Sequence, residues 1–159
     1  MLTPLPPRSN RPARPARPAF LLSQVGSFSS ARFAERVQEL GLTASEAGVL
    51  RFVARSPGSS QRALADRIGS APSRVVFLID SLETRGLLER RRGSADRRNQ
   101  ELWLTPAGDA TLGQLRQLAE EHETEILGSL TSDQVTQLSA LLTSIAEDHH
   151  LDHDLHAGT

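Results

Sequence analysis

Apolar side chains recur three and four residues apart along most of this chain, which is the spacing of one face of an α-helix. Glycine and proline interrupt the pattern, and one stretch shortens to two runs that suit strands. The pattern predicts four helices, a strand pair and two further helices. The expected ranges are 20–40, 43–56, 60–68 and 71–85 for the first helices, 87–92 and 100–104 for the strands, and starts at 105 and 131 for the last helices.

Local signals mark the ends of these helices. Residues 43–46 (Thr-Ala-Ser-Glu) and 131–134 (Thr-Ser-Asp-Gln) match capping boxes, in which the side chains of a helix start bond its unpaired backbone groups. Thr105 followed by Pro106 is a favourable N-cap and first helical residue. Glycines suited to helix ends are Gly41, Gly69 and Gly86.

The first predicted helix has an apolar stripe with one irregular step. Its members are Leu21, Val25, Phe28, Phe33, Val37 and Leu40. The step between Phe28 and Phe33 rotates the stripe, because neighbours on one helix face stand three or four residues apart. We therefore expect the two halves of this helix to pack on two different surfaces.

Helices 60–68 and 71–85 are joined by a glycine turn, which is the arrangement of a helix-turn-helix. In that motif the N-terminal half of the second helix enters the DNA major groove. Here that half carries Ser70, Ser73 and Arg74, and an arginine can bond both O6 and N7 of guanine. Phe77 follows one turn later, where it either contacts a thymine methyl group or packs in the core.

The strand pair carries an arginine-rich tip. Arg90, Arg91 and Arg92 end the first strand, where DNA phosphates would pass. The tip adds Ser94, Arg97 and Arg98. A narrow hairpin with arginines at its tip suits the DNA minor groove, and the alternative is a charged hairpin exposed to solvent. Its position directly after a helix-turn-helix predicts a winged helix.

Three segments closely resemble the MarR-type transcriptional regulators. Asp96-Arg97-Arg98 resembles the family's wing tip, and residues 102–108 (Leu-Trp-Leu-Thr-Pro-Ala-Gly) resemble the strand and helix start that follow the wing. Residues 72–76 (Pro-Ser-Arg-Val-Val) are similar to the start of the family's recognition helix, whereas Phe77 stands where the family often has a polar or basic residue. The resemblance covers residues 42–112.

This resemblance implies a homodimer on double-stranded DNA, with two recognition helices one DNA turn apart on a pseudo-palindrome. It implies that Asp96 braces Arg98 and so restricts a flexible side chain at the minor groove. It also implies a cleft between the dimer helices and the winged domain, where a small, often aromatic anion binds as effector. In this chain Phe28, Arg32 and Phe52 are candidates for lining the cleft, and packing explains each of them equally well.

Charge is unevenly distributed along the 159 residues, although the formal net charge is only −1. Residues 61–98 hold nine arginines and five acidic residues, whereas residues 99–159 hold eleven acidic residues and one arginine. Residues 1–60 are basic as well, with eight arginines and three acidic residues. The charge is therefore polarised along the chain, as expected if one part faces phosphate, and we expect the acidic last third to lie away from DNA.

Cysteine is absent, which excludes disulfides and thiolate metal sites. No apolar stretch is long enough to span a membrane, and Ser23 and Gln24 interrupt the apolar run near the N-terminus. We therefore expect a cytoplasmic protein that does not contact a membrane.

Both ends of the chain have biased compositions. Residues 1–18 hold six of the nine prolines, so we expect a disordered arm that either follows a DNA groove or remains a solvated tail. Residues 149–159 are rich in His and Asp, but their spacing fits no ordered metal site, so we expect a flexible polar tail. His122 lies on an apolar stripe, where a buried, hydrogen-bonded histidine is expected rather than a ligand.

These features predict a mainly α protein in which a winged helix-turn-helix with a small β-hairpin wing is embedded in a helical dimerisation frame. The expected divisions are an arm (1–18), a dimerisation helix (19–41), the DNA-binding domain (42–104), two dimerisation helices (105–148) and a tail (149–159). The predicted function is a dimeric transcriptional regulator, namely a repressor that a small molecule releases from DNA. A winged helix that binds proteins instead is the alternative, and no phosphate loop, nucleophile elbow or metal motif suggests an enzyme or a cofactor.

Overall fold

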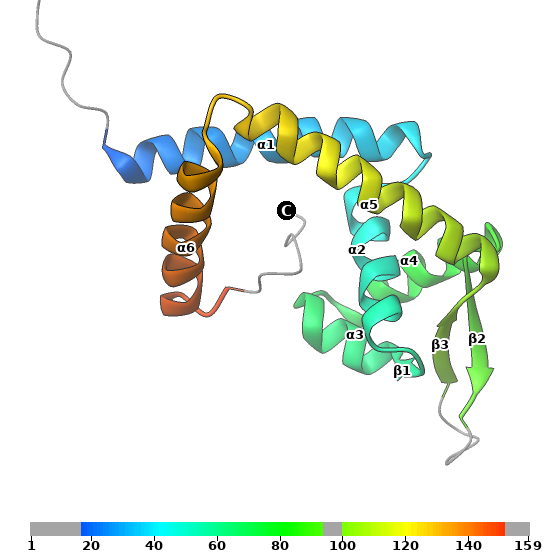
Figure 1. The fold of residues 1–159 in the computed structure, drawn as a ribbon. Coiled ribbons are helices and arrows are strands. Elements are labelled where there is room, and N and C mark those ends of the chain that lie inside the picture. The colour runs from blue at the N-terminus through cyan, green and yellow to red at the C-terminus, as the bar shows by residue number, and fades with distance from the viewer. Residues whose placement is uncertain (1–16, 94–99, 152–159) are drawn as a thin grey trace, which may run out of the picture.

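The computed structural model describes residues 17–93 and 100–151 (Figure 1). Its helices are α1 (Pro18–Glu39), α2 (Ala44–Arg55), α3 (Gln61–Ile68), α4 (Pro72–Thr84), α5 (Pro106–Leu127) and α6 (Ser132–Asp148). Its strands are β1 (Ser59–Ser60), β2 (Leu88–Arg92) and β3 (Gln100–Leu104). The predicted helices and strand pair are confirmed, and with them the mainly α fold with a small β-hairpin.

Both predicted capping boxes are present. The hydroxyls of Thr43 and Thr131 each accept the backbone N–H three residues further on, at the starts of α2 and α6. The side chains of Glu46 and Gln134 bond back to the backbone of the capping threonines. These bonds satisfy N–H groups that a helix start leaves unpaired, which explains why the boundaries were predictable.

A three-stranded antiparallel sheet has the strand order β1–β3–β2. Residues 88–92 of β2 pair with residues 100–104 of β3, and Ser59 of β1 pairs with Leu102 on the other edge of β3. The sequence did not predict β1, because two residues are too few to show the alternation that marks a strand.

The main core lies between α2, α3, α4 and the sheet, with contributions from α1 and α5. Its largest fully buried side chains are Val37, Leu42, Val49, Leu50, Val53, Leu64, Val75, Ile79, Leu82, Leu88 and Leu102. Most of these residues belong to 42–104, which we call the winged domain. α1 and α5 lie alongside each other and cover one end of it (Figure 1).

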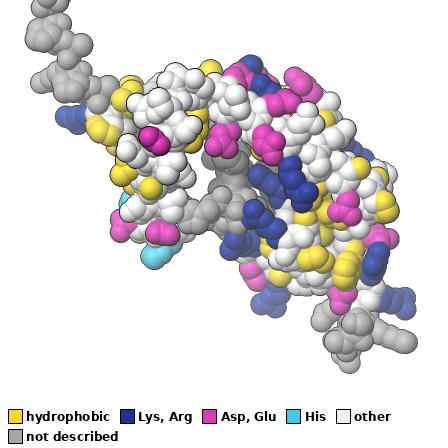
Figure 2. All heavy atoms as spheres, viewed as in Figure 1, with side chains coloured by type: hydrophobic (Ala, Val, Ile, Leu, Met, Phe, Trp, Pro, Cys, Tyr) yellow, Lys and Arg dark blue, Asp and Glu magenta, His cyan; other side chains and the backbone are white. Residues whose placement is uncertain are grey.

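The two halves of α1 differ, because only the second half packs on the core. Packing of the first half on another surface, which the irregular stripe predicts, remains a prediction. Phe33 is buried in the core, whereas Val25 and Phe28 are exposed. α6 has no buried residue, and its Leu141 is 64% exposed. Apolar side chains therefore lie on the surfaces of both helices, away from the winged domain (Figure 2).

No described helix is both long and apolar enough to cross a membrane.

Gly108 lies in the first turn of α5, where two backbone segments approach closely. A Cβ atom at this position would lie 2.0 Å from the carbonyl oxygen of Leu87. Thr105 fastens the same junction, because its hydroxyl donates to the carbonyl of Gly86 at 2.6 Å and accepts the N–H of Gly108 at 3.0 Å. These contacts hold the start of the wing against its exit, which gives a physical reason for the threonine and the glycine in this segment.

We expect Gly108→Ala to destabilise the protein by about 1–3 kcal/mol, because the added methyl group forces the two backbones apart. Thermal unfolding followed by circular dichroism measures the effect. Gly113→Ala is the matched control in the same helix, since nothing lies within 4 Å of its Cβ position. That control should gain up to about 1 kcal/mol through helix propensity, and similar melting temperatures for the two variants would contradict the prediction.

Candidate nucleic-acid interface

A tight turn sets the geometry of α3 and α4. Gly69 ends α3 with a φ of 59°, in the left-handed region that glycine adopts without strain. The N–H of the half-buried Ser70 then bonds back to the carbonyl of Ala65 at 3.3 Å, and α4 begins at Pro72. The predicted helix-turn-helix is therefore present, and Ser70 lies in its turn.

The outer face of α4 is exposed, whereas its inner face is anchored in the core. The anchoring residues are Val75, Leu78, Ile79 and Leu82. Ser73 and Arg74 lie exposed in the first turn, as predicted for residues that meet DNA. Phe77 is 72% exposed, so the alternative in which it packs in the core is wrong. Val76 is also exposed, at 41%, although no pattern in the sequence marks it as a surface residue.

The arginines of β2 alternate between the two faces of the sheet. Arg91 shares a face with Trp103, whose ring centroid lies 5.0 Å from its guanidinium carbon, and pairs with Glu89. Its side chain nevertheless remains 55% exposed, and Arg92 beyond it is exposed as well. Both residues are therefore accessible to phosphate.

Arg90 differs from its neighbours. One terminal nitrogen of its guanidinium lies 2.5 Å from Oδ1 of Asp80, and the other pairs with Glu83. Its side chain is only 16% exposed. This placement departs from the prediction that Arg90 contacts phosphate, because its charge is already matched by two carboxylates of α4.

The four remaining wing residues of the prediction are Ser94, Asp96, Arg97 and Arg98. They lie outside the described residues, so the contacts of the wing tip remain predictions from the sequence.

Glu46 is buried, with 6% exposed, and connects the start of α2 to α4. Its Oε1 accepts the hydroxyl of Ser81 at 2.6 Å, and its Oε2 accepts the N–H of Thr43 at 2.8 Å. Burial by itself would raise the pKa of Glu46, but these hydrogen bonds and the Arg85 guanidinium 3.8 Å away together lower it. The sequence identified Glu46 only as a capping residue, because no local pattern relates it to Ser81.

We expect Glu46→Gln to lower stability at neutral pH by about 1–3 kcal/mol, because an amide cannot accept all the bonds that the carboxylate accepts. Because the pKa of Glu46 is lowered, the Glu46 carboxylate binds a proton less readily in the folded protein than in the unfolded chain. The stabilisation is therefore complete above the unfolded pKa of about 4.3 and is lost as the pH falls through the lower folded value.

Urea unfolding at a series of pH values measures this effect. The difference between wild type and Glu46→Gln should narrow below about pH 4. Glu123→Gln makes the same chemical change at an exposed position and should leave stability nearly unchanged. A deficit in Glu46→Gln that stays constant with pH would contradict the assignment.

A cavity of about 140 Å³ lies between α2 and α5, beside α1. Apolar side chains and three arginines line it, including Phe33, Leu112, Leu115, Arg51, Arg55 and Arg116. An apolar wall combined with positive charge suits a small organic anion.

The three residues predicted to line an effector cleft do not line this cavity. Phe28 is 58% exposed on the outer half of α1, and Phe52 packs against the main core. Arg32 bonds Glu35 at 2.6 Å and Glu125 at 3.0 Å. The structure therefore does not bring these three residues together.

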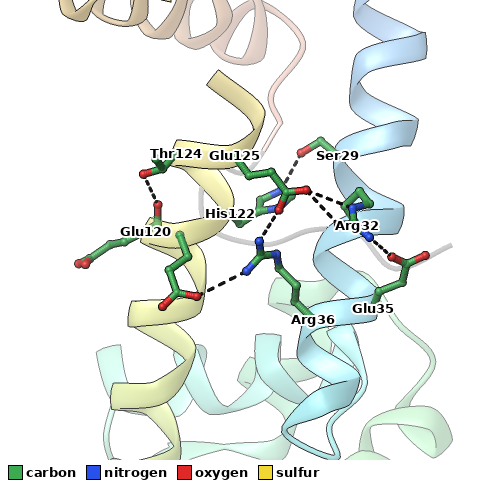
Figure 3. Close-up of polar contacts among 9 residues, drawn as sticks. Ser29, Arg32, Glu35, Arg36, Glu120, His122, Thr124 and Glu125 are labelled. Carbon is green, nitrogen blue, oxygen red and sulfur yellow. Dashed lines mark hydrogen bonds and ion pairs between the residues drawn. The ribbon is translucent and has the colours of Figure 1, made fainter. Parts of the chain in front are cut away.

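A polar cluster joins α1 to α5 (Figure 3). Arg36 and Arg32 of α1 both bond the carboxylate of Glu125 on α5. The hydrogen bond from Arg36, and then those from Arg32, hold the pKa of Glu125 below its usual value. The cluster links the two long helices outside the apolar core.

His122 lies beside this cluster. Its Nε2 is 3.0 Å from the hydroxyl of Ser29, and its ring centroid is 5.4 Å from that of Phe33. The hydrogen bond agrees with the expected structural histidine, although the residue is half-buried rather than buried. Within residues 17–93 and 100–151, no group of three or more His, Cys, Asp or Glu side chains could hold a metal ion. Residues 152–159 of the predicted His/Asp-rich tail lie outside the described residues, as do residues 1–16 of the arm.

The described geometry is that of a winged helix-turn-helix domain carried by long helices. Comparison with known proteins gives a family with this architecture. Residues 40–99 match the sequence model of the MarR family. The transcriptional regulator HosA of Escherichia coli is 28% identical over 113 residues, which cover 71% of this chain and 82% of HosA.

Solved structures agree with this match. The transcriptional repressor CouR, bound to a 23-mer DNA duplex, is 31% identical with a TM-score of 0.71, over 82% of this chain and 92% of CouR. A Mycobacterium tuberculosis MarR-family protein in complex with salicylic acid is 26% identical with a TM-score of 0.67, over 84% of this chain and 98% of that protein. This chain belongs to the MarR family of transcriptional regulators.

Proposed function

We propose that this protein is a dimeric repressor that binds a pseudo-palindromic operator in double-stranded DNA. The observation that carries the proposal is the outer face of α4, where Ser73, Arg74 and Phe77 are exposed while the opposite face is anchored in the core. A rigidly held helix with such a face suits the major groove. The related repressor CouR has been solved bound to DNA, which supports the same class of partner.

Each exposed residue has a role that its chemistry suggests. Arg74 bonds guanine in the major groove, and Phe77 contacts the methyl group of thymine. Arg91 and Arg92 bind phosphates and so position the protein without reading sequence. By sequence alone, Ser94, Arg97 and Arg98 extend the contact into the minor groove while Asp96 braces Arg98.

The dimer is assigned to residues 19–41 and 105–148. Its support is the apolar surface that one chain leaves uncovered on α1 and α6. The exposed members of that surface are Phe20, Leu21, Leu22, Val25, Phe28, Leu141, Leu142 and Ile145. A group of eight exposed apolar side chains on two helices marks an interaction site, and a second copy of the chain would bury it.

The effector is assigned to the cavity between α2 and α5. A cavity of roughly 150 Å³ holds a benzene ring, so the observed volume suits a small aromatic body, and the three arginines at its wall suit a carboxylate. The cavity lies between α2 of the winged domain and the long helix α5. A bound anion would therefore change the angle between the winged domain and α5. The salicylic acid complex of the related Mycobacterium tuberculosis protein supports this ligand class.

Capture of genomic DNA fragments with the full-length protein tests the proposed function. Captured fragments should share a pseudo-palindromic site, and their affinity should fall steeply with salt as phosphate contacts release counterions. Addition of salicylate should weaken binding if the effector assignment is right. If no fragment is bound with sequence preference, the proposed function is wrong.

A further inference from the structure

Arg90 links the wing to the recognition helix by three bonds. Its guanidinium reaches Oδ1 of Asp80 at 2.5 Å and the carboxylate of Glu83, and its backbone N–H donates to Oε1 of Glu83 at 3.2 Å. Asp80 and Glu83 stand three residues apart on α4, so they project from one side of the helix. We call these three residues the Arg90 bridge.

We propose that Arg90 is a positioning residue for DNA binding, which holds β2 at a set angle and distance from α4. This inference rests on the proposed function, because both elements must reach DNA at the same time. The planar guanidinium presents its donors in a rigid fork, so sliding or tilting β2 would break at least one bond. The strand is therefore already fixed against α4 before DNA binds, so binding does not cost the conformational entropy of fixing it.

The neighbouring arginines show that this arrangement is specific to one position. Leu88, Arg90 and Arg92 share a face of β2, since alternate strand residues point the same way. Leu88 is buried in the core and Arg92 is exposed, so Arg90 stands at the border between them. Arg91 lies on the other face and is 55% exposed.

The bridge also offsets negative charge on the recognition helix. Asp80 and Glu83 are the carboxylates that its C-terminal half carries, and unpaired carboxylates so close to the proposed DNA face would repel phosphate. Arg90 places a positive charge against both.

Salt dependence separates positioning from phosphate contact. The double variant Glu83→Gln/Arg90→Gln keeps the net charge of the bridge unchanged while it removes the guanidinium and its ion pairs with Asp80 and Glu83. Arg90→Lys keeps the positive charge but loses the planar fork. The probe is the duplex that wild-type protein selects from a random DNA library, and affinity is measured by fluorescence anisotropy at several salt concentrations. Arg92→Gln serves as the phosphate-contact comparison.

We expect both bridge variants to lose roughly tenfold or more in affinity, with the slope of log K against log salt unchanged. Arg92→Gln should lower that slope by about one. A lower slope in Glu83→Gln/Arg90→Gln, together with wild-type affinity in Arg90→Lys, would show that Arg90 binds phosphate and would overturn the proposal. Unchanged affinity in both bridge variants would overturn it as well.

Hydrogen exchange in the DNA-free protein gives an independent readout, because it reports the bridge without any DNA. Amides of β2 and β3 should exchange faster in both bridge variants, whereas those of α1 should not change. Unchanged exchange in the wing would overturn the proposal even if affinity fell. If exchange responds as expected but wild-type protein selects no DNA sequence, the proposed function fails, and with it the role of the bridge in DNA binding.

Discussion

Replacing Leu141 and Ile145 by aspartate should produce monomers that bind the two-half-site operator about 100-fold or more weakly than wild type. Both side chains are exposed on α6, at 64% and 45%, and the proposed dimer would bury them. An unpaired carboxylate strongly destabilises an apolar interface. A monomer binds one half-site through its single winged domain. It lacks the second, linked winged domain, whose high effective concentration at the other half-site strengthens binding of the dimer. Analytical ultracentrifugation and anisotropy titration measure the two effects.

The control places two aspartates at exposed positions of α5, as Gln114→Asp/Gln117→Asp. Both positions lie within the range assigned to the dimer, but neither belongs to the exposed apolar residues of α1 and α6 that support it. This variant adds the same charge and should remain dimeric. Its affinity should fall only through the added charge, which salt screens. A monomeric Leu141→Asp/Ile145→Asp protein with wild-type affinity would show that one winged domain suffices for binding.

Arg74→Ala should lower affinity for the operator by about 1–3 kcal/mol, or roughly 5- to 150-fold, and should abolish discrimination at one base pair of each half-site. The reason is that a pair of bonds from guanidinium to guanine distinguishes that base from the other three. Binding to a set of duplexes with single base-pair substitutions measures both effects. Affinity for unrelated DNA should fall much less.

Arg62→Ala removes the same charge from the exposed first turn of α3, outside the recognition helix. It should weaken all duplexes by a similar factor and leave the ranking of operator variants unchanged. If Arg74→Ala behaves in the same way, Arg74 contacts phosphate rather than a base.

Several structural features of this protein were predictable because their causes are local. The capping boxes at Thr43 and Thr131 involve residues three positions apart, and the helix-ending glycines act through their own backbone angles. The irregular step after Phe28 coincides with the boundary between the exposed and the core-packed half of α1, while the second packing surface that it predicts remains a prediction.

Features that depend on distant contacts were missed or assigned differently. Arg90 is the same residue type as its neighbours Arg91 and Arg92. It differs because its position on one face of β2 places its side chain beside Asp80 and Glu83. The cavity likewise combines residues of α1, α2 and α5. The sequence could not show which residues meet there, so the candidates Phe28, Arg32 and Phe52 were chosen by residue type and do not line it.

The order of helices and strands, their caps and the amphipathic faces follow from interactions within about four residues along the chain, and the amino-acid sequence carries that information directly. Tertiary packing alone decided that Phe77 is exposed, that Glu46 bonds Ser81, and that Arg90 pairs with Asp80 of α4. The physical reason is burial: the same carboxylate or guanidinium is a solvated surface charge or a structural bridge according to what the fold brings beside it.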